Sequence, residues 1–278
     1  RPRTMPYANI ITSRGCPYKC CFCQVGKISG NKPRLRSVDN ILKEIEMLKE
    51  KWSIDSLIFD DDNLVFDKER AKGIFQGMVD RRFNLKWNAI AMAAYKLDEA
   101  LISAMKESGC QYVDIAIESG VERILEDIIH KPLKLDHALK VASLLKKYQI
   151  DFAANFVIGF PGETWDEIRQ TMKFAEEFNA DYTKIFIATP LPNTELYDLA
   201  KRGGYLKESF SFNKHLWTDG WIDTEEFRSK DLKILRAYEW ERINFSNPDK
   251  CGKVADMMGI DIKRLTELRK NTLSRANP

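Results

Sequence analysis

Four cysteines lie within eight residues near the start of the chain, in the stretch SRGCPYKCCFCQVGK at residues 13–27. Cys16, Cys20 and Cys23 are spaced by four and then three positions, with Cys21 between them. Thiolates are soft ligands, and three of them in one short loop suit zinc or an iron–sulfur cluster. The spacing therefore predicts a metal site.

The choice of metal depends on how many ligands the chain can supply. Structural zinc normally takes four protein ligands, often as two Cys-x-x-Cys pairs. No second pair follows here, since Cys110 and Cys251 stand alone far downstream. A cubane iron–sulfur cluster held by three cysteines would leave one iron open for an exogenous ligand. A redox dithiol and a packed thiol loop are the simpler alternatives.

The elements around these cysteines are those of an α/β fold. Six short apolar stretches alternate with helical patterns, and most are rich in β-branched or aromatic residues, as parallel strands buried on both faces are. The cysteine loop directly follows the first stretch, and parallel α/β folds place their sites at the carboxyl ends of strands. The predicted strands span residues 8–13, 55–60, 85–93, 111–118, 151–160 and 182–189.

Helical patterns separate these strands. In residues 37–52 the apolar side chains recur with a period near 3.6. Thr164 with Glu167, and Ser119 with Glu122, match the capping box at the start of a helix. Six βα units in a row predict a parallel sheet with outer helices, either doubly wound or curled toward a barrel that lacks two of the usual eight units.

The last quarter of the chain supplies no convincing strand and reads as a loop followed by helices. We therefore predict a partial-barrel domain at residues 1–202 and a mostly helical extension at 203–278. Trp217, Trp221 and His215 in the loop could line a substrate cavity. The tryptophans are better explained as the core of this closing segment.

The composition is that of a soluble globular protein, with 278 residues of which 44% are hydrophobic and 31% charged. Lys and Arg total 44 against 41 Asp and Glu, so overall charge gives no support for nucleic-acid binding. No apolar run is long enough for a membrane span and no secretory leader opens the chain, so we expect a cytoplasmic protein. Arg1, not Met, is the first residue, which leaves room for an upstream domain.

The segment CPYKCCFC resembles the CxxxCxΦC signature of the radical S-adenosylmethionine superfamily, with Phe22 as the aromatic residue beside the cofactor. The resemblance implies that Cys16, Cys20 and Cys23 bind a four-iron four-sulfur cluster, and that Cys21 is the spare. S-adenosylmethionine would bind the fourth iron through its amino and carboxylate groups. The fold implied is a partial (β/α)6 TIM-like barrel with a helical C-terminal extension.

The chemistry implied is radical chemistry. One-electron reduction of the cluster would break a carbon–sulfur bond of the sulfonium, giving methionine and a 5′-deoxyadenosyl radical that abstracts hydrogen from a small-molecule substrate. An external donor such as flavodoxin or ferredoxin would supply the electron.

The same resemblance implies further cofactor-binding residues at the strand ends. Asp60, Asp61 and Asp62 end the second predicted strand, where relatives usually carry Gly-Gly-Glu, and would contact the amino group of the methionine moiety. Glu118 ends the fourth strand and would bind the ribose hydroxyls, the alternative being a partner cation. Ser119 beside it is a second candidate, although an N-cap role explains it adequately.

The fifth and sixth strands complete the implied site. In the motif NFVIGFPGET, at residues 155–164, Asn155, Ile158 and Gly159 are candidates, with Ile158 near the adenine. Ala188 is the candidate at the end of the sixth strand. Asn193 follows, where relatives usually have glycine, and a left-handed turn there tolerates asparagine.

The span 8–202 most resembles the radical domain of cobalamin-linked enzymes, anaerobic porphyrin cyclases and methylthiotransferases, through ESG, the later Lys131 and GFPGET. It departs from them at AMAAY, where relatives commonly carry an arginine. Cys251 alone is too few for auxiliary clusters, and the helical tail does not read as an RNA-binding barrel, so nucleic acid is an unlikely partner.

We therefore expect a radical enzyme linked to cobalamin in an upstream domain, acting as a methyltransferase or in a related oxidation or rearrangement. One alternative is a cobalamin-independent radical enzyme, for example a methylthiotransferase. The other, from a different class, is a non-catalytic barrel that uses its thiolates as a metal or redox clip.

Overall fold

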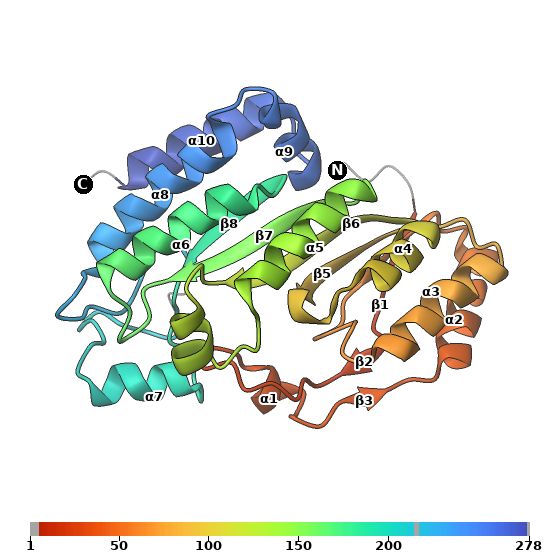
Figure 1. Ribbon diagram of the computed structural model, residues 1–278, viewed down its shortest axis with the longest axis horizontal. Coiled ribbons are helices and arrows are strands. Elements are labelled where there is room, and N and C mark those ends of the chain that lie inside the picture. Colours follow the sequence, from red (N-terminus) through yellow and green to blue (C-terminus); the bar gives the residue numbers. More distant parts are fainter. Residues whose placement is uncertain (1–5, 214–216, 277–278) are drawn as a thin grey trace.

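A six-stranded parallel sheet runs through the protein, and the computed structural model describes residues 6–213 and 217–276 (Figure 1). In spatial order the strands are β1 (Tyr7–Ile10), β4 (Ser56–Phe59), β5 (Lys86–Ala93), β6 (Cys110–Glu118), β7 (Asp151–Ile158) and β8 (Tyr182–Ile187). Every strand pairs with the next one in this order, and every pair is parallel. A doubly wound sheet would reverse its strand order at one point. The order here never reverses, so the predicted partial (β/α)6 barrel is confirmed.

Helices cover the outer face of the sheet (Figure 1). They are α2 (Val38–Trp52), α3 (Lys68–Asp80), α4 (Glu99–Glu107), α5 (Leu135–Lys147) and α6 (Trp165–Phe178), with the short helical turns η1 (Ala94–Lys96) and η2 (Ile124–Ile129). Between helix and sheet, Trp87 stacks on Phe75 with ring centroids 5.0 Å apart, and both rings are fully buried. No helix in the described part of the chain is long and apolar enough to cross a membrane.

The predicted helical extension is present and closes one edge of the sheet. It follows α7 (Glu195–Arg202) and consists of α8 (Ser229–Phe245), α9 (Lys250–Met258) and α10 (Ile262–Ala276). The side-chain amide of Asn244 accepts from the N–H of Thr183 at 2.8 Å and donates to its carbonyl at 2.9 Å. The Arg236 guanidinium donates to the Ile185 carbonyl at 2.9 Å. These bonds replace a neighbouring strand, because an uncovered edge would leave its backbone groups unpaired.

One of the two predicted capping boxes forms. The box at Thr164 is complete, with side chain and backbone bonded in both directions. The box at Ser119 was a wrong prediction: its hydroxyl accepts from the N–H of Val121, and the Glu122 carboxylate accepts from the N–H of Leu135. The reason is that the chain enters the π-helical turn η2 here, which shifts the register of the first turn.

The cysteine loop leaves the end of β1 and is closed at its base by a small antiparallel ribbon, β2 (Ser13–Arg14) with β3 (Arg34–Leu35). The short helix α1 (Val25–Ile28) lies inside the loop. Gly15 has a φ of 91°, and a Cβ there would lie 2.8 Å from the Gly30 carbonyl oxygen. Only glycine permits this close approach.

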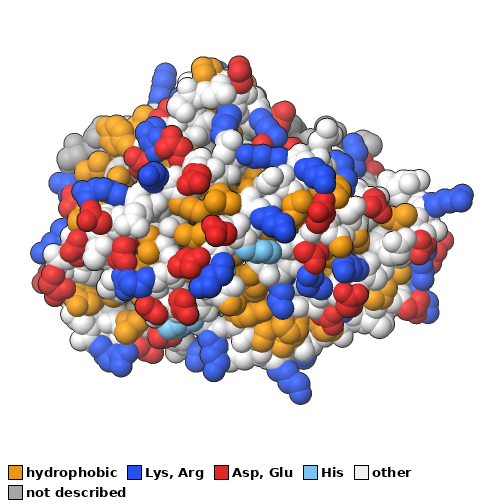
Figure 2. All heavy atoms as spheres, viewed as in Figure 1, with side chains coloured by type: hydrophobic (Ala, Val, Ile, Leu, Met, Phe, Trp, Pro, Cys, Tyr) orange, Lys and Arg blue, Asp and Glu red, His pale blue; other side chains and the backbone are white. Residues whose placement is uncertain are grey.

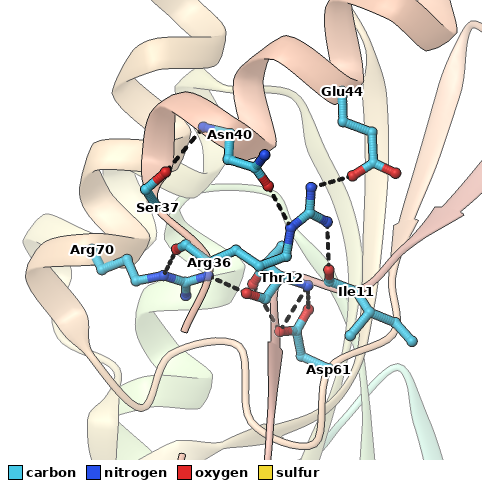
Figure 3. A network of polar contacts seen from close by, with 8 residues as sticks. All are labelled: Ile11, Thr12, Arg36, Ser37, Asn40, Glu44, Asp61 and Arg70. Carbon is cyan, nitrogen blue, oxygen red and sulfur yellow. Dashed lines mark hydrogen bonds and ion pairs between the residues drawn. The ribbon is translucent and has the colours of Figure 1, made fainter. Parts of the chain in front are cut away.

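Buried polar contacts fix the start of the loop (Figure 3). The Asp61 carboxylate, at the end of β4, accepts from the Thr12 N–H at 3.1 Å, the Thr12 hydroxyl at 2.7 Å and the Ser13 hydroxyl at 2.5 Å. Arg70 of α3 donates to the Thr12 carbonyl at 2.5 Å and to the Arg36 carbonyl at 2.8 Å. Two strand ends and one helix thus hold the residues that precede the cysteines.

We expect Arg70→Met to lower the free energy of unfolding by about 2–3 kcal/mol, because two charged hydrogen bonds to carbonyls are lost and the Asp61 charge loses a nearby cation. Arg169→Met is the control, since the exposed Arg169 side chain makes a pair with Asp166 and a contact over the Trp165 ring, together worth about 1 kcal/mol. Urea unfolding of the two variants measures the difference, and equal losses would contradict the role given to Arg70.

The turn from β7 to α6 is built around a buried carboxylate. Gly159 and Gly162 have φ values of 90° and 87°, which place both in the left-handed region. One oxygen of Glu163 accepts from the N–H groups of Gly159 at 2.6 Å and Phe160 at 3.1 Å. No described residue donates to the other oxygen, and burial raises the pKa of the Glu163 carboxyl to about 8. The turn therefore favours the protonated acid.

This raised pKa makes stability depend on pH. Because the folded-state pKa lies above the ordinary value of 4.5, ionisation favours the unfolded chain, and the Glu163 contribution is lost as pH rises from about 5 to 8. Glu163→Gln, which stays neutral, is expected to remove this fall, whose slope is at most about 1.4 kcal/mol per pH unit. Urea titrations across this range test it, and parallel curves for both proteins would refute it.

Candidate functional site

The cysteine loop separates its four thiols into two groups. Cys16, Cys20 and Cys23 are partly exposed, and residues 20, 21 and 23 of the loop line a cavity of about 610 Å³ between the loop and α7. Cys21 is buried, with its N–H bonded to the Ile129 carbonyl at 3.1 Å and its carbonyl accepting from the Leu196 N–H at 2.9 Å. The residue predicted to be spare thus packs in the core, and its backbone ties the loop to η2 and α7.

Burial and neighbouring charged groups shift the pKa values of Cys20 and Cys23. Burial raises the pKa of Cys20 to about 12, with Lys131 opposing and Glu118, Cys23 and Cys16 adding to the shift. The pKa of Cys23 is raised by burial in the same way. A metal centre binds thiolates, so its binding must displace these protons.

The described residues contain no three His, Cys, Asp or Glu side chains arranged around a single ion. A cubane cluster does not require that arrangement, because each cysteine binds a different iron atom.

Glu118 ends β6 next to this loop. Its φ of 77° is unusual for a residue with a side chain, and such strain gathers at functional sites. Lys131 donates to Oε1 of Glu118 at 2.9 Å, and both side chains are more than 90% buried. Among the described residues, no group donates to Oε2. The cation that the sequence offered as an alternative partner is therefore present, and a contact with ribose stays a prediction.

The acidic end of β4 supports the loop. Asp61 is occupied by Thr12 and Ser13, while Asp62 accepts from the Gly15 N–H at 2.7 Å. Asp60 is exposed. These bonds give Asp61 and Asp62 a positioning role that the sequence did not indicate, and the predicted contacts of all three aspartates with a cofactor remain untested.

The fifth and sixth strands bring the other predicted residues to the same edge of the sheet. Phe22 packs on Phe160 with ring centroids 5.9 Å apart. Ile158 and Ala188 are covered by the protein's own atoms, and the Ala188 N–H donates to the Ile158 carbonyl at 2.8 Å. Ser119 pairs its hydroxyl with Thr171 at 3.1 Å. Contact of these residues with a cofactor stays a prediction.

Two asparagines carry polar atoms without a partner. The side-chain oxygens of Asn155 on β7 and Asn63 after β4 are buried, and no described residue donates to either. An unsatisfied buried acceptor costs about 1–3 kcal/mol, so each oxygen fits a bound ligand with donor groups. Asn155 was predicted and pairs in register with Ala116, two residues before Glu118. Asn63 was missed, although it directly follows the three aspartates.

The segment AMAAY, in which the sequence lacks the expected arginine, ends in a tyrosine. Tyr95, the last residue of AMAAY, meets Tyr18 of the cysteine loop edge to face, with ring centroids 5.0 Å apart. Burial raises the pKa of Tyr95 well above its ordinary value, and Tyr18, Cys20 and Cys16 add to the shift. A neutral phenol therefore lies beside the thiols, and only the departure from the family pattern pointed to this position.

Of the two tryptophans predicted to form the core of the closing segment, one is buried. Trp221 is buried, as a core residue should be, while Trp217 is 50% exposed. His215 lies outside the described residues. The predicted left-handed turn at Asn193 is confirmed, with a φ of 62°, and this residue lines the same cavity as Cys20.

The donor set fits the cofactors that the sequence implied. Three separate thiols, the second carboxylate oxygen of Glu118 and the unpartnered Asn63 amide oxygen follow the carboxyl ends of parallel strands, and the unpartnered Asn155 oxygen lies within β7, three residues before its end. Thiolates suit an iron–sulfur cluster, and the oxygen acceptors suit the amino and hydroxyl donors of S-adenosylmethionine.

Comparisons with known proteins agree with this geometry. The chain is 32% identical over 233 residues to an uncharacterized methyltransferase of Pyrococcus horikoshii, PH0819, a match that covers 84% of this chain and 50% of that protein. It is also 32% identical to the cytidylyl-2-hydroxyethylphosphonate methyltransferase of Streptomyces wedmorensis, covering 87% of this chain and 47% of the enzyme. The chain thus spans about half the length of these curated relatives.

Among solved structures, the fold resembles the radical S-adenosylmethionine methyltransferase TsrM from Kitasatospora setae, determined with cobalamin and a [4Fe-4S] cluster bound. The TM-score is 0.66 at 19% identity, over 73% of this chain and 38% of TsrM. Residues 10–175 match the family model described as the Radical SAM superfamily, which confirms the resemblance carried by CPYKCCFC. The chain belongs to the Radical SAM superfamily.

Proposed function

We propose that this chain is the radical domain of a cobalamin-linked methyltransferase. The observation that carries the proposal is the division of the cysteine loop, in which three thiols stay accessible beside Glu118 and Lys131 while Cys21 is buried. Such a division suits a cluster held by three ligands. A buried fourth thiol would not suit a structural zinc site, because zinc there normally takes four protein ligands.

Cys16, Cys20 and Cys23 would hold the four-iron four-sulfur cluster. When bound, the cluster and S-adenosylmethionine supply a reductively cleaved sulfonium and a 5′-deoxyadenosyl radical. The protein residues bind, orient and exclude water. Tyr95 and Tyr18 lie beside Cys16 and Cys20 and would exclude water from that side of the thiolates.

The strand ends would bind S-adenosylmethionine. Glu118 accepts from the ribose hydroxyls through Oε2, because Lys131 already holds Oε1 in place. The oxygens of Asn155, within β7, and Asn63, after β4, offer two more acceptors. Asp62 would contribute indirectly, because it holds the backbone of Gly15, the residue before the first cysteine ligand.

The cobalamin part of the proposal rests on the relatives. Two relatives bear the name methyltransferase, and the solved structure of TsrM contains cobalamin. The corrinoid would be carried by a part of the protein beyond this chain, which spans only about half of its relatives. The methyl acceptor would be an unactivated carbon of a small molecule, or the outcome a related oxidation or rearrangement.

The test is anaerobic product analysis of the iron-reconstituted chain with S-adenosylmethionine, dithionite and added methylcobalamin. We expect 5′-deoxyadenosine from the wild-type chain and none from Cys16→Ala, which loses one ligand of the cluster. Cys21→Ala is the matched control and should keep both its iron and its product, because Cys21 lies in the core.

Each outcome has a meaning for the proposal. Full iron in Cys16→Ala, or loss of iron in Cys21→Ala, would contradict the ligand assignment. A loaded wild-type chain that forms no 5′-deoxyadenosine would contradict radical chemistry and favour the thiolate-clip alternative. 5′-Deoxyadenosine whose formation is unaffected by added methylcobalamin would favour the cobalamin-independent alternative.

A further inference from the structure

Charge is unevenly distributed along the chain. The first 38 residues contain eight Lys or Arg and no Asp or Glu, and the first acidic residue is Asp39. The whole chain is nearly balanced, with 44 basic and 41 acidic residues, so the rest of it carries an excess of acid. The basic segment is the one that contains the cysteine loop.

Most of these cations face solvent without an acidic partner. Arg36 is an exception, since it pairs with Glu44 inside the scaffold of the loop. None of the others within the described residues forms a salt bridge. We call the exposed set the basic collar; its members from the loop are Arg14, Lys19, Lys27, Lys32 and Arg34. Figure 2 shows Lys and Arg side chains projecting from the lower edge of the molecule, where α1 lies in Figure 1.

The helix α7 extends the collar across the cavity. Lys201 and Arg202, both exposed, line it opposite Lys19 and Lys27. Two carboxylates, Glu195 and Asp198, line it as well, and Glu195 is paired with His130 at 3.2 Å. Cations therefore outnumber acids at the mouth of a cavity whose wall includes Cys20 and Cys23.

Two apolar side chains next to collar residues in the sequence are exposed. Ile28 at the end of α1 is 78% exposed and Leu35 on β3 is 40% exposed. A single exposed isoleucine needs no explanation. Exposed apolar groups adjacent to unpaired charges of one sign, here Ile28 beside Lys27 and Leu35 beside Arg34, are however typical of a protein-docking surface, in which apolar contacts give affinity and charges give orientation.

We propose that the basic collar with Ile28 and Leu35 docks a small acidic protein that carries one low-potential electron. The proposal rests on the proposed function, because it is the cluster ligands Cys20 and Cys23 that open beneath this surface. Opposite charge steers such a partner toward the collar and accelerates encounter. One electron passes from the carrier to the cluster, with no bond made or broken and no proton required.

The test measures binding, separately from catalysis. The probe is an oxidised flavodoxin with an acidic surface, titrated anaerobically into the iron-loaded chain while its flavin fluorescence anisotropy or thermal shift is followed. We expect Lys27→Glu/Lys32→Glu to weaken binding by about tenfold or more, and wild-type binding to weaken steeply with added salt. Ile28→Ser should weaken binding severalfold with little change in the salt dependence.

The helix α10 supplies matched controls, since it lies at the end of the molecule away from α1 (Figure 1). It carries exposed Lys263 and Lys270, and its Ile262 is 51% exposed. Lys263→Glu/Lys270→Glu and Ile262→Ser make the same chemical changes and should leave flavodoxin affinity unchanged. Iron content is measured in every variant, so that loss of the cluster is not mistaken for loss of docking.

Three results would overturn the proposal. The first is equal weakening of flavodoxin binding by the α10 and collar variants. The second is wild-type binding that is absent or insensitive to salt. The third is binding of tRNA that is lost in the collar variants and that displaces flavodoxin. The last would assign the surface to nucleic acid. If flavodoxin docks at the collar but the chain forms no 5′-deoxyadenosine with dithionite, the proposed function is refuted and the docking surface stands. If the chain forms 5′-deoxyadenosine but flavodoxin does not dock at the collar, the docking surface is refuted and the proposed function stands.

Discussion

The buried carboxylate of Asp61 fixes the geometry on which the rest of the site depends. It collects donors from Thr12 and Ser13, the residues that lead from β1 into the cysteine loop. A buried charge is costly unless it is paired and hydrogen-bonded. Arg70 supplies the nearby cation and, through its own bonds to two carbonyls, links α3 to the same residues (Figure 3). The start of the loop is therefore held rigidly, and the residues that follow it can supply the ligands.

A second constraint is the open barrel. Six strands that step in one direction leave an edge at β8, and the extension closes it with the side chains of Asn244 and Arg236 in place of a seventh strand. The carboxyl edge of the sheet stays free. Cys20, Glu118 and Lys131 meet at that edge, where each residue changes the electrostatics of the others. Closing the sheet with a helical tail is thus what leaves the site accessible.

The sequence could predict what depends on local pattern. All six strands, the Thr164 capping box and the left-handed Asn193 follow from periodicity and from residue types whose preferences are local. The family signature found the cysteines because ligand spacing within one loop is also local. The Ser119 capping box failed because the register of the next turn is set by tertiary packing.

What could not be predicted depends on partners distant in the chain. The positioning role of Asp61 requires Thr12, which is 49 residues away, and the pairing of Glu118 with Lys131 requires the turn η2 to bring the lysine back. The role of Tyr95 could not be predicted, since its contact with Tyr18 joins two separate segments. The run of basic residues in the first 38 positions is visible in the sequence, whereas Lys201 and Arg202 join the same cavity only through the fold.

The central claim is that three cysteines hold a cluster whose fourth iron is open to S-adenosylmethionine. The most direct measurement is the electron paramagnetic resonance spectrum of the reduced, iron-reconstituted chain before and after S-adenosylmethionine is added. The account predicts a shift in the g-values on addition, because the amino and carboxylate groups of the ligand bind one iron directly. A reduced cluster whose spectrum is unchanged by saturating S-adenosylmethionine would contradict it.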